Sequence, residues 1–414
     1  MPRPIAAFAI ALAASVLAAC THAPADHDVQ ARIARVLDET PLVDGHNDLM
    51  IHYHACRDGC PRGPDGYDIG TRTSGHTDIP RWRAGRLGAQ LLNSGWTDDD
   101  APTLDGTLEG FEFARALVAL HASDLVLART SAEIRQAHAN GRIAMVLSLE
   151  TPERLGTDEA TVRRLAEAGL RADILAYEGP TAYADGHAGP MEHGGLSPLG
   201  RKMVGWMQAN GILVDLSHAS ADTARDVLDI ARAPVIFSHS NAAALCGVSR
   251  NVPDDVLRRM RANGGIVMAT FVPEFTDKAF DDWWNRGDAA WKGLLQRFGG
   301  DRARANPEMD RWERENPPPV VALAEVADHI EHIRDVAGID HVGLGGDFDG
   351  IDYTIEGLGD VSTYPRLFEE LARRGWSDAD LKKLAGENFL RVLDAADAAS
   401  ARLKGSARDR RRTR

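Results

Sequence analysis

The stretch Pro41-Leu42-Val43-Asp44-Gly45-His46-Asn47-Asp48 begins apolar and ends in a polar cluster, a pattern typical of a buried strand that runs into a loop. His46 and Asp48 are two residues apart, and side chains at positions i and i+2 of a strand point to the same face. An imidazole nitrogen and a carboxylate oxygen would therefore leave the strand end together, which suits a metal such as zinc. An isolated His-x-Asp is more often a polar turn, so the interpretation depends on partners from elsewhere in the chain.

Seven more short apolar runs follow, and segments with helical periodicity separate most of them. The eight runs are Pro41–Asp48, Gly88–Trp96, Ala144–Glu150, Ala172–Tyr177, Gly211–His218, Ala233–His239, Gly264–Val272 and His341–Phe348. The predicted helices include Thr107–Ala122, Glu159–Ala168, Pro198–Ala209, Ala221–Ala231, Asp254–Ala262, Tyr364–Arg373 and Asp378–Ala396. This alternation predicts an α/β fold, a closed (β/α)8 TIM-like barrel. A doubly wound open sheet is the alternative, which the lack of a Gly-x-Gly-x-x-Gly turn after an early strand disfavours.

Two regions are longer than a minimal barrel needs, residues 51–87 and residues 273–340. The second is a long insertion between strands seven and eight. It contains four tryptophans, Trp283, Trp284, Trp291 and Trp312. Loops that follow barrel strands lie at the C-terminal face, where active sites form. We expect most of these indoles to pack the insertion on the barrel, and the alternative is that they line a substrate pocket.

The N-terminus has the features of a targeting segment. Arg3 precedes the short apolar run Ile5–Val16, and Leu17-Ala18-Ala19-Cys20 follows. A Cys at this junction resembles the bacterial lipoprotein signal, in which Cys20 is lipidated; an ordinary secretory signal is the alternative. The lipoprotein interpretation predicts an exported protein with a lipid anchor in a bacterial cell-envelope membrane, facing the periplasm or the exterior.

The remaining boundaries follow from the same pattern. We expect a signal peptide over residues 1–20, a tether over 21–34, the barrel domain over 35–398 and a basic, disordered tail over 399–414.

The 414 residues carry a formal net charge of −14, which argues against a nucleic-acid partner. In an exported protein, Cys56 and Cys60 are candidates for a small disulfide loop.

Polar residues at the ends of separate predicted strands supply the missing partners. Three histidines and two carboxylates suffice for two metals if one carboxylate bridges them. Glu150 is the candidate bridge, because its strand lies between those of the other ligands. One metal would take His46, Asp48 and Glu150, and the other Glu150, His218 and His239.

With these residues assembled, the chain resembles the membrane (renal) dipeptidase family of binuclear zinc hydrolases, within the amidohydrolase-type barrels. The resemblance covers roughly residues 35–395. The matching motifs are Val43-Asp44-Gly45-His46-Asn47-Asp48, His193-Gly194-Gly195-Leu196-Ser197-Pro198, Val214-Asp215-Leu216-Ser217-His218, Ser238-His239-Ser240-Asn241, Arg250-Asn251-Val252 and Gly345-Gly346-Asp347-Phe348-Asp349-Gly350.

The resemblance implies the same five zinc ligands and adds further roles. It implies that Arg250 binds the terminal carboxylate of the substrate, with Asn251 beside it in the substrate site, and that Asp347 handles the proton. A planar guanidinium suits a carboxylate because the two pair through parallel hydrogen bonds. Members of the family are often dimers, so a homodimer is one assembly open to this chain.

The chain departs from the family pattern in two places. Tyr177 stands where members carry a His that contacts the substrate carbonyl, and Thr151-Pro152 replaces the usual Gly-Gly after the bridging Glu. A tyrosine hydroxyl can donate a hydrogen bond to a developing oxyanion. Unlike His, it does not become a cation at neutral pH, which bears on substrate range.

The resulting hypothesis is zinc-dependent hydrolysis of dipeptides. Two zinc ions would lower the pKa of a bridging water from about 15.7 to about 7, and the hydroxide would attack the peptide carbonyl. Two alternatives stay open. One is hydrolysis of an N-acyl amino acid, a lactam or an ester on the same site, because a fold with two metals does not choose among these. The other is a lipid-anchored binding protein without catalysis.

Overall fold

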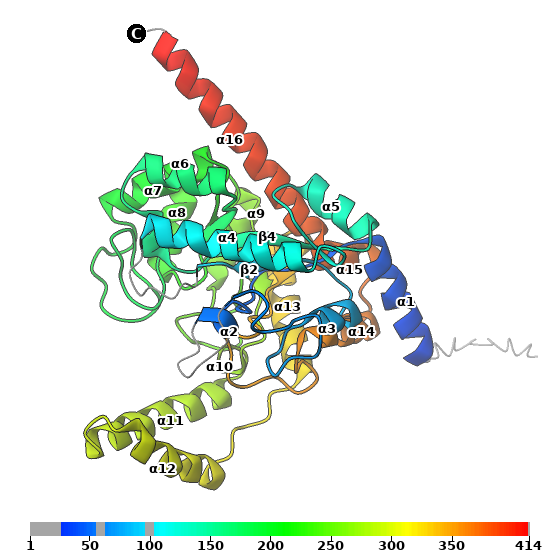
Figure 1. Cartoon of the computed structure of the whole chain (residues 1–414), viewed down its shortest axis with the longest axis vertical. Coiled ribbons are helices and arrows are strands. Elements are labelled where there is room, and N and C mark those ends of the chain that lie inside the picture. Colours follow the sequence, from blue (N-terminus) through cyan, green and yellow to red (C-terminus); the bar gives the residue numbers. More distant parts are fainter. Residues whose placement is uncertain (1–25, 55–62, 96–102, 413–414) are drawn as a thin grey trace, which may run out of the picture.

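The protein folds as the predicted barrel. The computed structural model describes residues 26–54, 63–95 and 103–412 (Figure 1). Eight parallel strands pair in the order β2-β1-β9-β8-β7-β6-β5-β4, and pairing of β2 with β4 closes the ring. The barrel strands are β1 (Leu42–Asp44), β2 (Leu87–Asn93), β4 (Ile143–Leu149), β5 (Ala172–Ile174), β6 (Leu213–Asp215), β7 (Ile236–Phe237), β8 (Ile266–Ala269) and β9 (Val342–Leu344).

A further strand, β3 (Leu125–Leu127), was not predicted and pairs only with β4, outside the ring. Its three residues are too few to show a pattern in sequence. The helices around the barrel are α4 (Leu104–Leu120), α5 (Ser131–Ala139), α6 (Glu159–Ala168), α7 (Pro198–Ala209), α8 (Ala221–Ile230), α9 (Asp254–Asn263), α13 (Leu323–Ala337) and α14 (Tyr364–Arg373). Shorter helices are α2 (Ile51–His54), α3 (Ile79–Ala84), α10 (Pro273–Thr276) and α15 (Asp378–Lys382).

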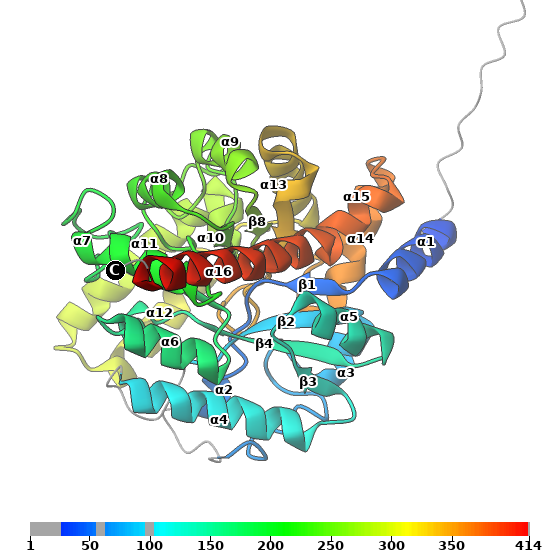
Figure 2. The ribbon, with the colours of Figure 1, turned by 90° about the horizontal axis from the view of Figure 1, so that it is seen from above.

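The barrel interior is closed at its N-terminal end. Inward-facing apolar residues such as Leu91 and Val146 form one cluster with Phe389 and Leu393 of α16 (Asn388–Arg412). A Cβ atom on Gly386, just before α16, would lie 2.1 Å from a backbone oxygen at the start of β1. Figure 2 shows α16 crossing the molecule over this end. Only the C-terminal strand ends are therefore left to build a site.

Two predicted boundaries were wrong. Residues 26–34, expected in a tether, belong to helix α1 (Asp26–Glu39), whose Val29 and Ile33 are buried in the core. The tail expected from residue 399 instead continues α16 to Arg412. Ala399 is buried, and the Ser400 hydroxyl donates to a carbonyl oxygen at the end of α7, at 2.8 Å. The buried face of this segment is small, and a run of basic residues follows it in the sequence.

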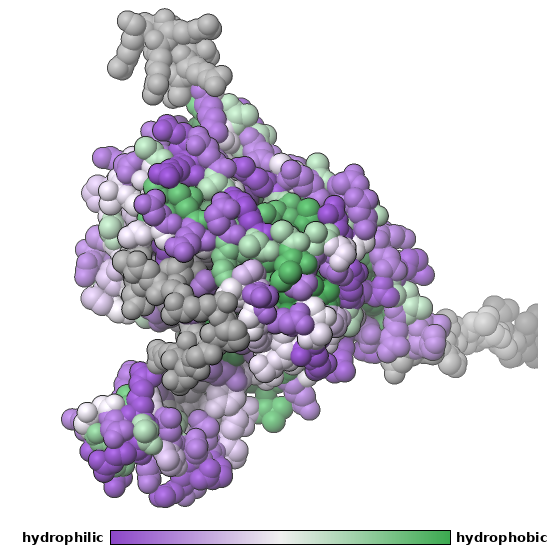
Figure 3. All heavy atoms as spheres, in the orientation of Figure 1, coloured by the Kyte–Doolittle hydropathy of each residue, from purple (hydrophilic) through white to green (hydrophobic). Residues whose placement is uncertain are grey.

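The insertion between the last two barrel strands forms a helical hairpin of α11 (Lys278–Arg297) and α12 (Arg302–Glu315), which projects from the barrel (Figure 1). On the side seen in Figure 3, its surface is mostly hydrophilic. Trp283, on α11, is buried, and its indole N–H donates to the backbone oxygen of Asn316, just after α12, at 2.7 Å. This bond ties the two helices of the hairpin together.

Some predicted features lie outside the described residues. These are the signal segment with Cys20 and the pair Cys56 and Cys60. Cys246 is described, and it is buried and free. Among the described residues, every helix is too short or too polar to cross a membrane.

Candidate metal centre

The five predicted ligands meet at the C-terminal mouth of the barrel. His46 and Asp48 follow β1, Glu150 follows β4, and His218 and His239 follow β6 and β7. Four groups of the described residues each place three ligand atoms within 4.8 Å of one another. Two of the four are the predicted sets, one of His46, Asp48 and Glu150 and one of Glu150, His218 and His239.

Glu150 joins the two groups through its two carboxylate oxygens. Oε2 lies 3.3 Å from Nε2 of His46. Oε1 lies 2.9 Å from Nε2 of His218 and 3.1 Å from Nε2 of His239. The two oxygens thus face different histidines, which is the arrangement that a carboxylate bridging two cations requires.

The charges of the centre suit cations. Burial and then the Arg250 guanidinium lower the pKa of His218 to about 4, and burial and the charge of His46 hold the pKa of His239 well below its usual range. Both imidazoles are therefore neutral at pH 7, as metal ligands must be. His46 differs: burial opposes its charge, but the carboxylates of Glu150 and Asp48 outweigh burial and hold its pKa well above the usual range, because this part of the centre attracts positive charge.

These residues fit two zinc ions by their chemistry. The set offers imidazole nitrogens and carboxylate oxygens, the ligands that zinc takes in catalytic sites. Nε2 of His218 and Nε2 of His239 lie only 3.1 Å apart, and both nitrogens turn toward Glu150 rather than toward backbone partners. A cation between such convergent lone pairs would offset the negative charge of the buried carboxylates.

Asp347 lies beside this centre. Its Oδ1 is 3.8 Å from Nε2 of His46, and it groups with His46 and His239. Burial raises the pKa of Asp347 to about 7; His46 lowers it, whereas the neighbouring carboxylates of Asp48 and Glu150 raise it further. Asp347 and His218 also hold positive φ angles of 62° and 66°. Strained backbone of this kind gathers at functional sites.

Supporting residues that the sequence did not single out hold the ligands in place. The Asn93 amide donates to Oδ1 of Asp48 at 2.8 Å, and the Ser238 hydroxyl lies 2.7 Å from Nδ1 of His239. The buried Asp44 carboxylate accepts from the backbone N–H of Gly346 at 2.7 Å and thereby ties β1 to the strand end before Asp347. Asn93 is a polar residue near the end of the predicted strand Gly88–Trp96, and this position could have indicated its contact with Asp48.

Arg250 is buried next to the centre with unused donors. Nη1 donates to the Ser240 hydroxyl at 2.6 Å, whereas Nε and Nη2 have no hydrogen-bond partner among the described residues. Its guanidinium lies 5.4 Å from the ring centroid of Phe275. A buried guanidinium with free N–H groups is costly unless an anion pairs with it, so these two donor groups are available to an anion.

Asn251 is placed differently from the prediction. Its amide donates to the backbone oxygens of Cys246 at 2.9 Å and Phe275 at 2.7 Å, and its carbonyl accepts from the Asn241 N–H. These bonds fix the loop that carries Arg250. Asn251 therefore acts as a positioning residue, and the expectation that it contacts substrate is not supported.

Tyr177, in the loop after β5, lies at the mouth of the centre and is 44% exposed. Its ring stacks on that of His218, with centroids 4.5 Å apart. Burial of the hydroxyl, and then the charges of Glu150 and Asp48, raise its pKa, so it remains a donor at neutral pH. Glu178 and His187 form a further group of ligand atoms with His218; the sequence did not point to either.

Comparisons with known proteins agree on one family. A family model described as membrane dipeptidase (peptidase family M19) matches residues 30–407. The dipeptidase verJ of Clonostachys rogersoniana is 34% identical over 391 residues, which cover 91% of this chain and 89% of that protein. The probable dipeptidase PvdM of Pseudomonas aeruginosa has the same fold, with a TM-score of 0.75 at 24% identity, over 90% of this chain and 99% of that one.

A second solved structure adds a ligand. A metallopeptidase of Rhodobacter sphaeroides, liganded with a phosphinate mimic of the dipeptide L-Ala-D-Ala, is similar with a TM-score of 0.66. It is 24% identical, over 86% of this chain and 99% of that one.

Proposed function

The chain belongs to the membrane dipeptidase family, peptidase family M19, and on that premise we propose that it hydrolyses dipeptides at a centre of two zinc ions. The observation that carries the proposal is the position of Glu150. Its two oxygens face separate sets of nitrogen and oxygen ligands, one with His46 and the other with His218 and His239. The fold and family support a metallo-dipeptidase, and this geometry supports the number of ions.

The two ions would supply a water activated at neutral pH and a Lewis acid for the peptide carbonyl. The protein supplies the remaining groups. Asp347 accepts the proton of the attacking water on its carboxylate and passes it to the leaving amine. It lies close enough to His46 to face the same reacting atoms.

Arg250 and Tyr177 define the substrate. The two unpaired donor groups of Arg250 bind the C-terminal carboxylate of the dipeptide. Binding of this carboxylate beside the centre would restrict the enzyme to very short peptides. The Tyr177 hydroxyl, at the mouth, donates to the oxyanion as it forms.

The substrate class is tested with matched compounds. L-Ala-L-Ala, L-Ala-D-Ala, N-acetyl-Ala and L-Ala-L-Ala amide present the same side chain with different ends. We expect hydrolysis of the dipeptides with a free carboxylate; the D-residue is included because the Rhodobacter sphaeroides metallopeptidase binds a mimic of L-Ala-D-Ala. Preference for N-acetyl-Ala would instead favour an acylase on the same barrel.

The metal requirement is tested by chelation. Removal of metal should abolish hydrolysis, and zinc should restore it; full activity in metal-free protein would refute the proposal. Asp347→Asn should lower kcat by about 10²- to 10⁴-fold, the usual contribution of a proton-transfer group, with the zinc content unchanged. Asp335→Asn, an exposed carboxylate paired with Arg334, is the matched control and should have full activity.

We also propose, on the sequence alone, that Cys20 carries a lipid anchor at the cell envelope. Cys20→Ser should release the protein from the membrane fraction and abolish labelling by a radioactive fatty acid. Unchanged labelling would contradict the anchor without touching the catalytic proposal.

A further inference from the structure

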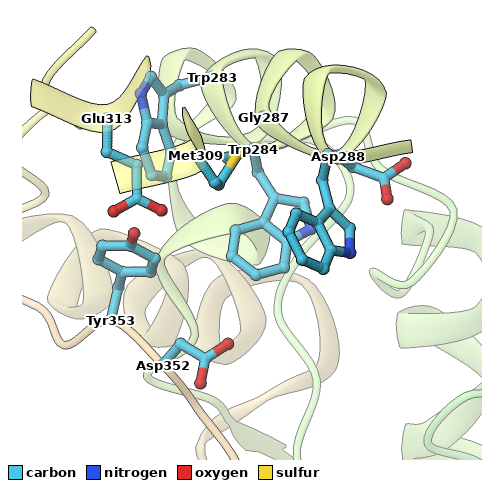
Figure 4. A pocket seen from close by; sticks show the side chains of 9 residues that line it. Trp283, Trp284, Gly287, Asp288, Met309, Glu313, Asp352 and Tyr353 are labelled. Atoms are coloured by element: carbon cyan, nitrogen blue, oxygen red, sulfur yellow. The ribbon is translucent and has the colours of Figure 1, made fainter. Parts of the chain in front are cut away.

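A cavity of about 430 Å³ lies outside the metal centre, between the α11–α12 hairpin and the loop after β9. Figure 4 shows its side chains converging from the two helices and this loop. Its lining shares no residue with the metal centre. The lining residues are Trp283, Trp284, Gly287, Asp288, Trp291, Met309, Glu313, Asp352 and Tyr353.

Aromatic rings make up most of the wall. Trp283 meets Tyr353 edge-on, with ring centroids 5.2 Å apart at 85°, and Trp284 meets Tyr353 at 6.2 Å and 84°. Trp283 is fixed by its bond to Asn316, whereas Trp284 and Trp291 are only partly buried. The rings therefore form a preformed aromatic wall, in which two of the indoles keep part of their surface exposed.

The charge of the lining has one sign. Three carboxylates, Asp288, Glu313 and Asp352, border the cavity, and its lining contains no Lys, Arg or His. Lys292 pairs with Asp288 at 2.7 Å from outside the lining, where both are largely exposed. Glu313 accepts a hydrogen bond from the Tyr353 hydroxyl, and Figure 4 shows its carboxylate directed toward that ring.

We propose that this cavity binds a small organic cation, with its ammonium group among the rings of Trp283, Trp284 and Tyr353 and next to the Glu313 carboxylate. The faces of aromatic rings carry negative charge, and several rings around one point attract ammonium groups, quaternary ones above all. The carboxylates add attraction and disfavour anions. The cavity has the size of small-molecule sites, which measure about 300–1,000 Å³.

The experiment compares choline with 3,3-dimethylbutan-1-ol, which has the same shape without the charge. Binding to the whole protein is measured by calorimetry. We expect choline to bind about tenfold more tightly, a difference of about 1.4 kcal/mol, which lies between the contributions of exposed and of desolvated cation–π contacts. Equal affinity for choline and its neutral analogue would show that the cavity binds by apolar contact alone. No binding of choline would show that the cavity does not take an organic cation. Either result overturns the proposal.

Variants locate the site. Trp284→Leu and Glu313→Gln should each weaken choline binding by several-fold, while Trp206→Leu, a change on α7 away from the cavity, should leave it unchanged. Retention of wild-type affinity in both cavity variants would place the cation elsewhere and refute the assignment. Because the comparison of choline with its neutral analogue uses the unmodified protein, the proposal stays testable even if a variant does not fold.

Discussion

The metal centre and the α11–α12 hairpin differ in how their side chains are held. The ligands of the centre follow four strands of one closed sheet, and His46, Asp48, His218 and His239 are all buried. The hairpin cavity is built from two adjacent helices and one loop, with Trp284 and Trp291 partly exposed. A closed sheet fixes the relative positions of residues far apart in the chain, whereas a hairpin only positions its own segment. Catalysis should therefore depend on the first region and be nearly indifferent to the second.

The largest expected effect is at the bridge between the two sets of ligands. Glu150→Gln keeps the shape of the side chain and removes the charge that both sets share. We expect kcat/KM to fall by more than about 10⁴-fold, beyond the contribution of a single proton-transfer group, together with loss of zinc by elemental analysis. A variant that retains two zinc ions and measurable turnover would contradict the bridging role.

A smaller loss is expected at the substrate carboxylate. Arg250→Lys keeps the charge but not the paired donors, and one charge-assisted hydrogen bond contributes about 1.5–3 kcal/mol. We expect kcat/KM for a dipeptide to fall by about 10- to 100-fold, mostly through KM. The ratio of kcat/KM on a dipeptide to kcat/KM on its C-terminal amide should also fall. An unchanged ratio would show that Arg250 does not bind the carboxylate.

Between the two regions, Glu274 on α10 should affect stability rather than activity. Burial, with smaller effects from Asp352 and Asp281, raises its pKa from 4.5 to about 7. Because the folded state favours the protonated form, the stability from this group is present below pH 4.5 and is lost as the pH rises through 7. At pH 8 the free energy of unfolding of Glu274→Gln should therefore exceed that of the wild type, by at most about 3 kcal/mol.

The measurement for Glu274 is urea unfolding at pH 5 and pH 8. At pH 5 the variant should gain little, because the wild-type carboxyl is then protonated when folded. A gain of equal size at both pH values would show that charge on Glu274 is not the cause.

The smallest effect is expected at the far end of the hairpin. Phe298 packs against the guanidinium groups of Arg297 and Arg304, which lie 5.1 Å and 4.8 Å from the centroid of its ring, respectively. Exposed contacts of this kind contribute about 0.5–1 kcal/mol. Phe298→Ala should lower the free energy of unfolding by about that amount and leave kcat/KM unchanged. A clear loss of activity would show that the hairpin and the centre are coupled.

The barrel and the ligand set were predictable from sequence because both repeat one rule. The apolar runs that supply the ligands end in polar residues, and parallel strands bring such ends to one face. His46, Glu150, His218 and His239 followed directly. Their supports did not, since the contacts of Asn93 and Asp44 join residues that no local pattern relates.

Helix ends and insertions were harder to predict. Val29 and Ile33 of α1 follow a polar segment, and Ala399 and Ser400 of α16 precede a basic one. The composition of these neighbouring segments therefore predicted a tether and a disordered tail where the chain is helical and packed. The tryptophans of the insertion were visible in the sequence. Their grouping around a cavity depends on how α11 folds against α12, which the sequence pattern does not state.

The central claim is that Glu150 bridges two zinc ions, and crystallography of the zinc-loaded protein tests it most directly. Anomalous diffraction at the zinc edge should show two peaks, one on each side of the Glu150 carboxylate. The first should lie between His46 and Asp48 and the second between His218 and His239. A single peak, or two peaks that Glu150 does not join, would contradict the account.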